Sequence, residues 1–127
     1  MVKRKSGIII NIGSIAGKEV YTKGNVYCAS KFAVDAISKG MRLDLNNFDI
    51  KVTSINPGLV ETEFSMVRFK NNIDKARNVY KGIQPLKAND VAEIIDFIIK
   101  RPDNICISDI SILPKSQASS IVVKRSD

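Results

Sequence analysis

With 127 residues, a net charge of +7 and 44% apolar residues, the chain has the size and composition of one small globular domain. It has no His, which excludes His-based catalysis and most zinc sites, and Cys28 and Cys106 lack metal-ligand spacing; we therefore predict no metal and a reducing, cytoplasmic setting. The basic residues are spread along the chain without interleaved aromatic residues, and no apolar stretch approaches the roughly 18 residues of a membrane span, so we expect neither nucleic acid nor a membrane as partner.

The first half of the chain predicts a strand, a loop and a long helix. Residues 7–12 form a short, nearly continuous apolar run, which is typical of a strand buried on both faces of a parallel sheet. A glycine-containing loop over residues 13–24 follows. Asn25 is a good N-cap, and the apolar and small residues after it recur at helical spacing, so we predict a helix from about Asn25 to Asn46 or Asn47.

The second half predicts two more strands around another helix. Residues 50–55 form a strand that stops at Asn56, Pro57 and Gly58, and residues 62–81 form one or two short helices that act as a flap. A helix begins near Asn89 and ends before Pro102. Residues 105–113 form a last strand at an edge or interface, with Asp109 at a turn or bulge, and residues 115–127 form an irregular tail.

Strands that alternate with helices indicate an α/β fold with a parallel sheet. Three parallel strands make an unusually narrow sheet, because parallel sheets are normally wider and covered on both faces. The first strand begins at residue 7 with no crossover before it. We therefore expect the chain to be part of a larger fold, with further strands upstream.

A Tyr-x-x-x-Lys pair, Tyr27 and Lys31, lies 13 residues beyond Ser14. On a helix, positions i and i+4 share one face, so the ammonium group can lie near the phenol. A phenol titrates near 10, and lowering its pKa by about three units requires roughly 4 kcal/mol. A cation about 4 Å away at an effective dielectric near 20 supplies roughly that amount. The pair can therefore serve as an acid/base group near neutral pH.

Two further features fall at the carboxyl ends of predicted strands, where open α/β sheets bind ligands. Ser14 closes the first strand, and Pro57-Gly58 closes the second, with Thr62 four residues beyond Gly58. Singly, each feature has an ordinary reading: a hydroxyl that bonds its own backbone, a turn, or a surface Tyr–Lys pair. Together, in this order, they predict one catalytic site.

The three features together resemble the short-chain dehydrogenase/reductase family, over essentially the whole chain. The resemblance implies the C-terminal half of a Rossmann-type, doubly wound parallel sheet, three strands with intervening helices, and an N-terminal nucleotide-binding half that this chain lacks. It implies that Ser14 orients a substrate carbonyl, Tyr27 transfers the proton, and Lys31 lowers the pKa of that tyrosine while binding the nicotinamide ribose. It also implies a nicotinamide site lined by Pro57, Gly58, Val60 and Thr62, with Tyr27 and Lys31 as further contacts of the cofactor.

Residues 58–65 and Val67-Arg68-Phe69 are similar to the subgroup of NADP-dependent 3-hydroxy acid dehydrogenases, also described as serine or L-allo-threonine dehydrogenases. This similarity implies NADP as cofactor and a small hydroxy acid, such as serine, L-allo-threonine or a 3-hydroxypropionate-like acid, as substrate. Arg68 then pairs either with the substrate carboxylate or with a structural partner. Tyr21 and Tyr80 either touch the substrate or pack in the core or a loop, and we expect the packing role.

Two other functions stay open. The chain fits a broad-specificity carbonyl reductase, and it also fits a truncated, inactive remnant or oligomerisation module. Enzymes of the family form dimers and tetramers through the helix after residue 25 and the last strand, so the resemblance also implies a homo-oligomer.

Overall fold

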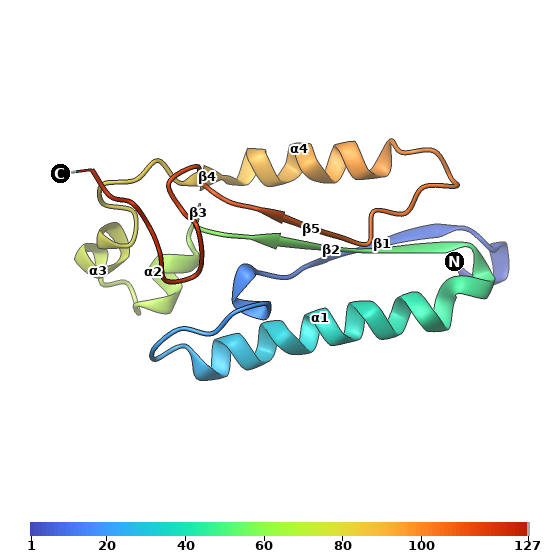
Figure 1. Cartoon of the computed structure of the whole chain (residues 1–127), viewed down its shortest axis with the longest axis horizontal. Coiled ribbons are helices and arrows are strands. Elements are labelled where there is room, and N and C mark those ends of the chain that lie inside the picture. The colour runs from blue at the N-terminus through green and yellow to red at the C-terminus, as the bar shows by residue number, and fades with distance from the viewer. Residues whose placement is uncertain (127) are drawn as a thin grey trace.

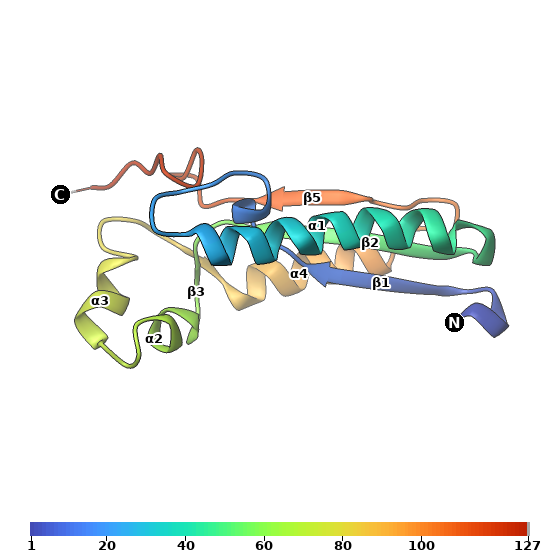
Figure 2. The ribbon, with the colours of Figure 1, turned by 90° about the horizontal axis from the view of Figure 1, so that it is seen from below.

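The computed structural model describes residues 1–126 and has the predicted α/β architecture. Three parallel strands, β1 (Gly7–Ile12), β2 (Ile50–Pro57) and β5 (Asp109–Ile112), pair in the order β1-β2-β5. Helices α1 (Asn25–Leu45) and α4 (Ala88–Ile99) lie on opposite faces of this sheet (Figure 1). Viewed from below, α1 lies in front of the sheet and α4 behind it (Figure 2).

The central strand β2 carries the core. Gly7 to Ile12 of β1 pair in register with Ile50 to Ile55 of β2, and residues 54–57 of β2 pair with β5. Nearly every residue of β2 is buried, whereas β1 is only half-buried. The prediction that residues 7–12 are buried on both faces is therefore wrong, because β1 is an edge strand and lacks a neighbour on one side among the described residues.

Element boundaries differ from the predicted ones at four places. β2 continues through Asn56 and Pro57, and α4 begins one residue early, at Ala88. α1 begins at Asn25 itself, with Gly24 as N-cap, and gives way to a 3-10 helix over Asn46–Phe48. The last strand is much shorter than residues 105–113. The Ile107 carbonyl oxygen accepts from the Thr53 side chain, and the first backbone bond to β2 is the one from the Ser54 N–H to the Ser108 carbonyl oxygen.

The flap and the tail lie at the carboxyl end of the sheet (Figure 1). The flap holds α2 (Phe64–Arg68) and α3 (Ile73–Asn78), as predicted for residues 62–81. It is bounded by two short strands that the sequence does not predict, β3 (Val60–Glu61) and β4 (Leu86–Lys87), which pair in parallel. The tail forms an isolated antiparallel bridge between Gln117 and Val123, and its last residue, Asp127, lies outside the described residues.

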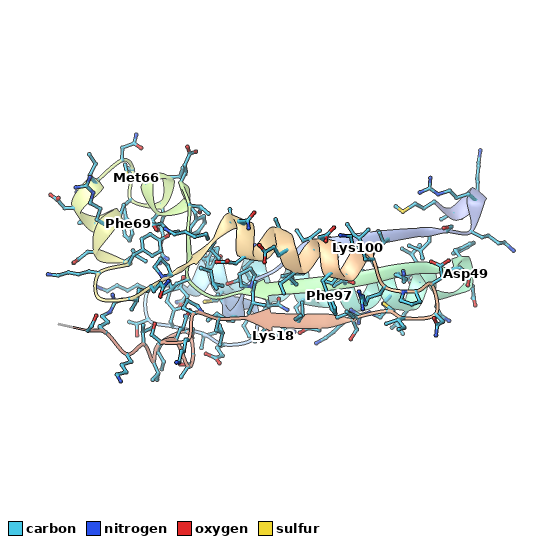
Figure 3. All side chains as sticks on the ribbon, turned by 90° about the horizontal axis from the view of Figure 1, so that it is seen from above. Lys18, Asp49, Met66, Phe69, Phe97 and Lys100 are labelled. Atoms are coloured by element: carbon cyan, nitrogen blue, oxygen red, sulfur yellow. The ribbon has the colours of Figure 1, made fainter. Side chains whose placement is uncertain are left out.

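An ionic cluster centred on the buried Asp35 joins the loop after β1 to α1 and β5. The Lys18 ammonium lies 2.5 Å from Asp35 and 2.9 Å from Asp109, and Lys39 binds Asp35 at 2.8 Å. Figure 3 shows Lys18 beside β5. Asp109 was predicted at a turn or bulge, but it begins β5 and also accepts a hydrogen bond from Asn56. Hydrogen bonds from Lys18 and Lys39 hold the pKa of the Asp35 carboxyl below its ordinary value.

We expect Asp35→Asn to lower the free energy of unfolding by about 2 kcal/mol at pH 7, because Lys18 then loses one buried partner. Asp35 has a lowered pKa in the folded state, so its contribution is complete above its ordinary pKa of 3.8 and disappears as the pH falls through the folded value. The penalty of the substitution should therefore shrink in acid. Urea unfolding at pH 7 and below pH 3.8 measures both effects.

Asp96→Asn is the matched control, because Asp96 pairs with Lys100 one helical turn away but on an exposed surface. It should cost less than about 0.5 kcal/mol at either pH. Equal penalties for the two substitutions would show that the cluster around Asp35 has no special weight.

Candidate functional site

The eight residues proposed from the sequence line one cavity of about 560 Å³ at the carboxyl end of the sheet. They come from the end of β1, from α1, from the end of β2, from β3 and the residue after it, and from α2: Ser14, Tyr27, Lys31, Pro57, Gly58, Val60, Thr62 and Arg68. The structure thus brings together residues that lie up to 54 positions apart in the chain. A volume of this size lies in the range of small-ligand sites.

Ser14 lies just beyond the carboxyl end of β1, and the backbone that follows it fixes its side chain. Ser14 is the N-cap of a 3-10 helix over Ile15–Gly17, and its side-chain oxygen accepts a hydrogen bond of 3.1 Å from the Ala16 N–H. One lone pair of the Ser14 hydroxyl therefore bonds the neighbouring backbone, as the ordinary role of such a hydroxyl predicts. The hydroxyl proton remains available for donation to a ligand in the cavity.

Tyr27 lies half-buried on the first turn of α1, beneath the flap. Its ring centroid is 5.6 Å from that of Phe64, with the ring planes tilted by 47°. Burial raises the pKa of the Tyr27 phenol above its ordinary value of 10.0, and the Ser14 side chain acts in the opposite direction. The phenol therefore carries its proton at neutral pH in this structure.

Lys31 lies one helical turn beyond Tyr27, as the i, i+4 spacing requires. Its ammonium lies 5.9 Å from the Tyr27 ring centroid and donates a 3.0 Å hydrogen bond to the Ile12 carbonyl oxygen. Burial lowers the pKa of Lys31. The expectation that Lys31 lowers the pKa of Tyr27 is therefore not met here: the ammonium is directed to the end of β1, and desolvation of the phenol dominates.

The backbone between β2 and β3 forms another wall of the cavity. The Gly58 N–H donates to the Ile112 carbonyl oxygen at 2.8 Å, and the Leu59 carbonyl oxygen accepts from Leu86 at 3.0 Å. The Thr62 side chain accepts a hydrogen bond of 3.2 Å from the N–H of Phe64, the first residue of α2, and so fixes the start of that helix.

Arg68 ends α2 at the rim of the cavity and is exposed. Its guanidinium carbon lies 5.7 Å from the Tyr21 ring and 5.6 Å from the Phe69 ring. None of the ion pairs among residues 1–126 involves Arg68. The alternative of a structural ion pair therefore finds no support in the described part of the chain, and the guanidinium stays free for an anion.

Several cavity residues are absent from the sequence-based set. Tyr21, predicted to pack in the core or a loop, lines the cavity, as do Gln117 and Ser120 of the tail and one face of α4: Ala88, Val91, Ala92 and Ile95. Helical periodicity predicts the apolar face of α4, but nothing in the sequence predicts that this face lines the same cavity as Tyr27. Gln117-Ala118-Ser119 in the tail resembles the same subgroup as residues 58–65, but no local pattern places these residues at the cavity.

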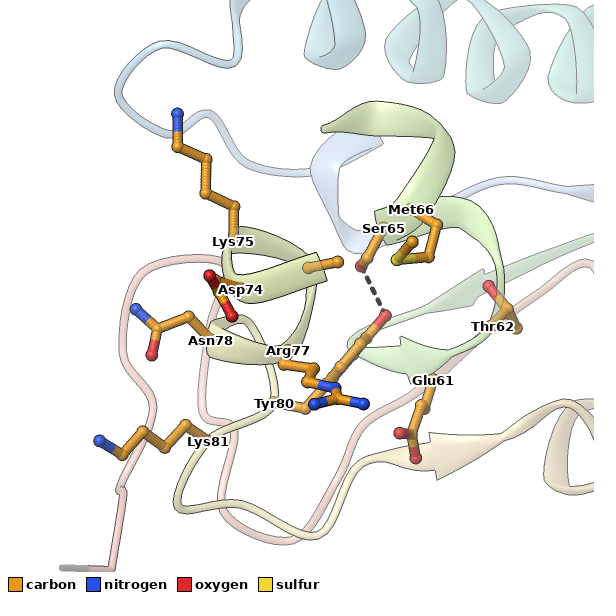
Figure 4. Close-up of a pocket in the computed structure, with 11 residues that line it drawn as sticks. Glu61, Thr62, Ser65, Met66, Asp74, Lys75, Arg77, Asn78, Tyr80 and Lys81 are labelled. Atoms are coloured by element: carbon orange, nitrogen blue, oxygen red, sulfur yellow. Dashed lines mark hydrogen bonds between the residues drawn. The ribbon is translucent and has the colours of Figure 1, made fainter. Parts of the chain in front are cut away.

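A second cavity, of about 690 Å³, lies on the outer side of the flap (Figure 4). Its wall includes the hydroxyl pair of Ser65 and Tyr80, whose oxygens lie 2.7 Å apart, and the Tyr80 hydroxyl also donates to the Val60 carbonyl oxygen. Tyr80 also lines the first cavity, so it separates the two. Through these two hydrogen bonds, Tyr80 links the flap to β3.

Other classes of site find no basis in residues 1–126. No group of three or more His, Cys, Asp or Glu side chains is placed to hold a metal ion, and both cysteines are free. Within the same residues, no helix is long and apolar enough to cross a membrane.

The short chain dehydrogenase family matches residues 1–73, which include Ser14, Tyr27, Lys31 and Gly58. An NADP-dependent 3-hydroxy acid dehydrogenase of Schizosaccharomyces pombe is 42% identical over 122 residues, covering 96% of this chain and 47% of the relative. A serine 3-dehydrogenase of Rhizobium radiobacter is 39% identical over 118 residues, with 93% and 47% covered. The chain thus spans about half the length of the curated relatives it matches.

A solved structure gives the same picture. The closed form of a serine dehydrogenase complexed with NADP+ superposes on all of this chain with a TM-score of 0.92 and 39% identity, and the match covers 52% of that protein. A serine dehydrogenase from Escherichia coli matches 93% of this chain and 44% of its own with a TM-score of 0.73 and 34% identity.

Proposed function

Because this chain belongs to the short-chain dehydrogenase family, we propose that it forms the catalytic half of an NADP-dependent oxidoreductase acting on a small 3-hydroxy acid. Serine, L-allo-threonine and 3-hydroxypropionate-like acids are the substrates we propose. The observation that carries the proposal is the cavity in which Ser14, Tyr27, Lys31 and the Gly58 backbone meet. The names of the S. pombe and R. radiobacter relatives support the cofactor and the substrate class.

The residues of the cavity suit the nicotinamide end of NADP. Hydroxyl and ammonium groups of Tyr27, Lys31 and Thr62 stand beside apolar surface from Pro57 and Val60, which fits a flat ring joined to a ribose. The bound cofactor would supply or accept the hydride. We propose that Ser14 donates a hydrogen bond to the substrate oxygen and that Lys31 fixes the ribose.

Tyr27 is the proposed proton-transfer group. Since burial raises the pKa of its phenol, the group is protonated at neutral pH, which is the form needed to donate a proton to a carbonyl oxygen during reduction. In the oxidative direction the phenolate is the base. We therefore expect oxidation of the hydroxy acid to speed up as the pH rises toward and beyond 10.0.

Arg68→Ala should raise the KM for a 3-hydroxy acid about tenfold and leave kcat nearly unchanged, because the guanidinium is placed to bind a carboxylate that does not react. Steady-state kinetics with the acid and with its uncharged methyl ester separate this charge effect from a general defect: the ester should be unaffected. Arg68→Lys should recover part of the affinity. An unchanged KM for the acid would favour the alternative of a broad-specificity carbonyl reductase.

The second candidate, a remnant or oligomerisation module, is favoured by one observation: α1 exposes apolar side chains, with Val26 87% and Leu43 79% accessible. The same surface supports a homo-oligomer, a dimer or tetramer, for the enzyme. The free cysteines support a cytoplasmic location.

NADPH titration of the 127-residue chain, followed by cofactor fluorescence, separates the two candidates. Saturable micromolar binding would oppose the remnant. Oligomers that do not bind NADPH would support it.

A further inference from the structure

The C-terminal tail, which the sequence presents as an irregular extension, forms a wall of the cavity. Its residues 114–120, here called the strap, cross the carboxyl end of the sheet next to the loop between β2 and β3 (Figure 1). Gln117 and Ser120 of the strap line the same cavity as Tyr27 and Lys31. The strap thus belongs to the site by position, although it lies far from Ser14 and Tyr27 in the sequence.

Gln117 makes the central contact of the strap. Gln117 is only 6% exposed, and its side-chain oxygen accepts a 2.8 Å hydrogen bond from the Leu59 N–H. Its side-chain nitrogen donates to the Ser119 carbonyl oxygen at 3.1 Å, which fixes the orientation of the amide. A Cβ atom on Gly58 would come within 2.2 Å of the Gln117 oxygen, so the amide packs directly on the glycine.

This contact adds to the hydrogen bonds that hold the turn from Gly58 to Val60. The Gly58 N–H is held by β5, the Leu59 carbonyl by Leu86, and the Val60 carbonyl by the Tyr80 hydroxyl. The Leu59 N–H is a further donor of this turn, and Gln117 supplies its acceptor. Loss of the partner of an N–H in this half-buried turn is unfavourable, so we expect the turn to depend on Gln117 to keep this geometry.

The strap is anchored at its C-terminal end, and the chain is anchored again beyond it. The Ser120 N–H and hydroxyl donate to the same carboxylate oxygen of Glu19, at 2.8 and 2.9 Å, which joins the strap to the loop that follows Ser14. Beyond the strap, the Ser126 N–H donates to the Gly82 carbonyl oxygen at 2.8 Å, and Arg125 binds the Val79 carbonyl at the end of the flap. Gln117 is therefore held in place before any ligand arrives.

We propose that Gln117 is a positioning residue of the cofactor site, which fixes the Gly58–Val60 turn through the Leu59 N–H so that its backbone is shaped to receive the nicotinamide end of the cofactor. The proposal rests on the proposed function for the identity of the ligand. Gln117 acts through the backbone of the turn and needs no contact with the reacting atoms.

Two substitutions separate the hydrogen bond from the shape of the side chain. Gln117→Met keeps the unbranched length but replaces the amide oxygen by a poor acceptor, whereas Gln117→Glu keeps an acceptor oxygen for the Leu59 N–H and gives up only the donor to Ser119. In the full-length protein without cofactor, Gln117→Met should speed amide hydrogen exchange at Leu59 about tenfold and leave the amides of β2 unchanged. Gln117→Glu should keep the protection of Leu59.

Cofactor binding then tests the functional part. Gln117→Met should raise the Kd for NADPH and the KM for NADPH about tenfold, with kcat changed less than about threefold, and Gln117→Glu should restore most of the affinity. Wild-type protection of Leu59 in Gln117→Met would overturn the proposal, and so would faster exchange with an unchanged Kd. If the wild-type protein fails to bind NADPH, the proposed function fails, while the exchange measurement still decides whether Gln117 fixes the turn.

Discussion

Replacing Tyr27 with Phe should lower turnover of a 3-hydroxy acid by about 10² to 10⁴ in the full-length protein, because the substitution removes the only proposed proton-transfer group and leaves the ring in place. The ring continues to pack against Phe64, so we expect little change in stability. The Kd for NADPH should rise less than about fivefold, since Lys31, Thr62 and the Gly58 backbone still hold the cofactor when the Tyr27 hydroxyl is lost. Steady-state kinetics and cofactor fluorescence measure the two quantities on the same sample.

Tyr21→Phe is the matched control, because Tyr21 lines the same cavity but lies in the loop before α1, without Lys31 one turn away. It should lower turnover less than about tenfold. The pH profile adds a readout: the alkaline rise in oxidation that the raised pKa of Tyr27 predicts should be lost in Tyr27→Phe and kept in Tyr21→Phe. Near-wild-type turnover of Tyr27→Phe would remove Tyr27 from the mechanism.

The part of the site that lies on regular elements could be predicted from the sequence. Ser14 ends an apolar strand, Tyr27 and Lys31 share a helix face, and Gly58 ends another strand, so their meeting follows from parallel pairing alone. The side-chain electrostatics did not follow. Spacing places the Lys31 ammonium near Tyr27, but it does not reveal that the Ile12 carbonyl competes for that ammonium, or that burial dominates the pKa of the phenol.

Features that depend on contacts between distant segments could not be predicted. The two-residue strands β3 and β4 are too short to show periodicity. The segment before Asp109 has the composition of a strand, yet the carbonyl oxygen of Ile107 accepts from the Thr53 side chain and not from the backbone of β2. Gln117 reaches Leu59 across 58 positions, and only the folded path of the tail brings the two together.

Gly17→Ala should separate the loop that carries Ser14 from the helix that carries Tyr27 and Lys31. Gly17 is buried in the 3-10 helix after Ser14, and a Cβ atom there would lie 2.6 Å from the carbonyl oxygen and 2.9 Å from the carbonyl carbon of Lys31. Both atoms are backbone of α1, so no side-chain rotation relieves the contact. We expect a loss of about 1 to 3 kcal/mol in the free energy of unfolding.

The same shift should lower turnover about 100-fold, because a displacement near 1 Å between reacting groups has effects of that size. Gly40→Ala is the matched control, since Gly40 lies on the same helix with nothing within 4 Å of its added Cβ; it should stabilise the protein by about 0.5 to 1 kcal/mol and leave turnover unchanged. Urea unfolding and steady-state kinetics of both variants test the pair. If Gly17→Ala kept wild-type turnover, the close approach of the loop to Lys31 could not be what holds Ser14 and Tyr27 in register.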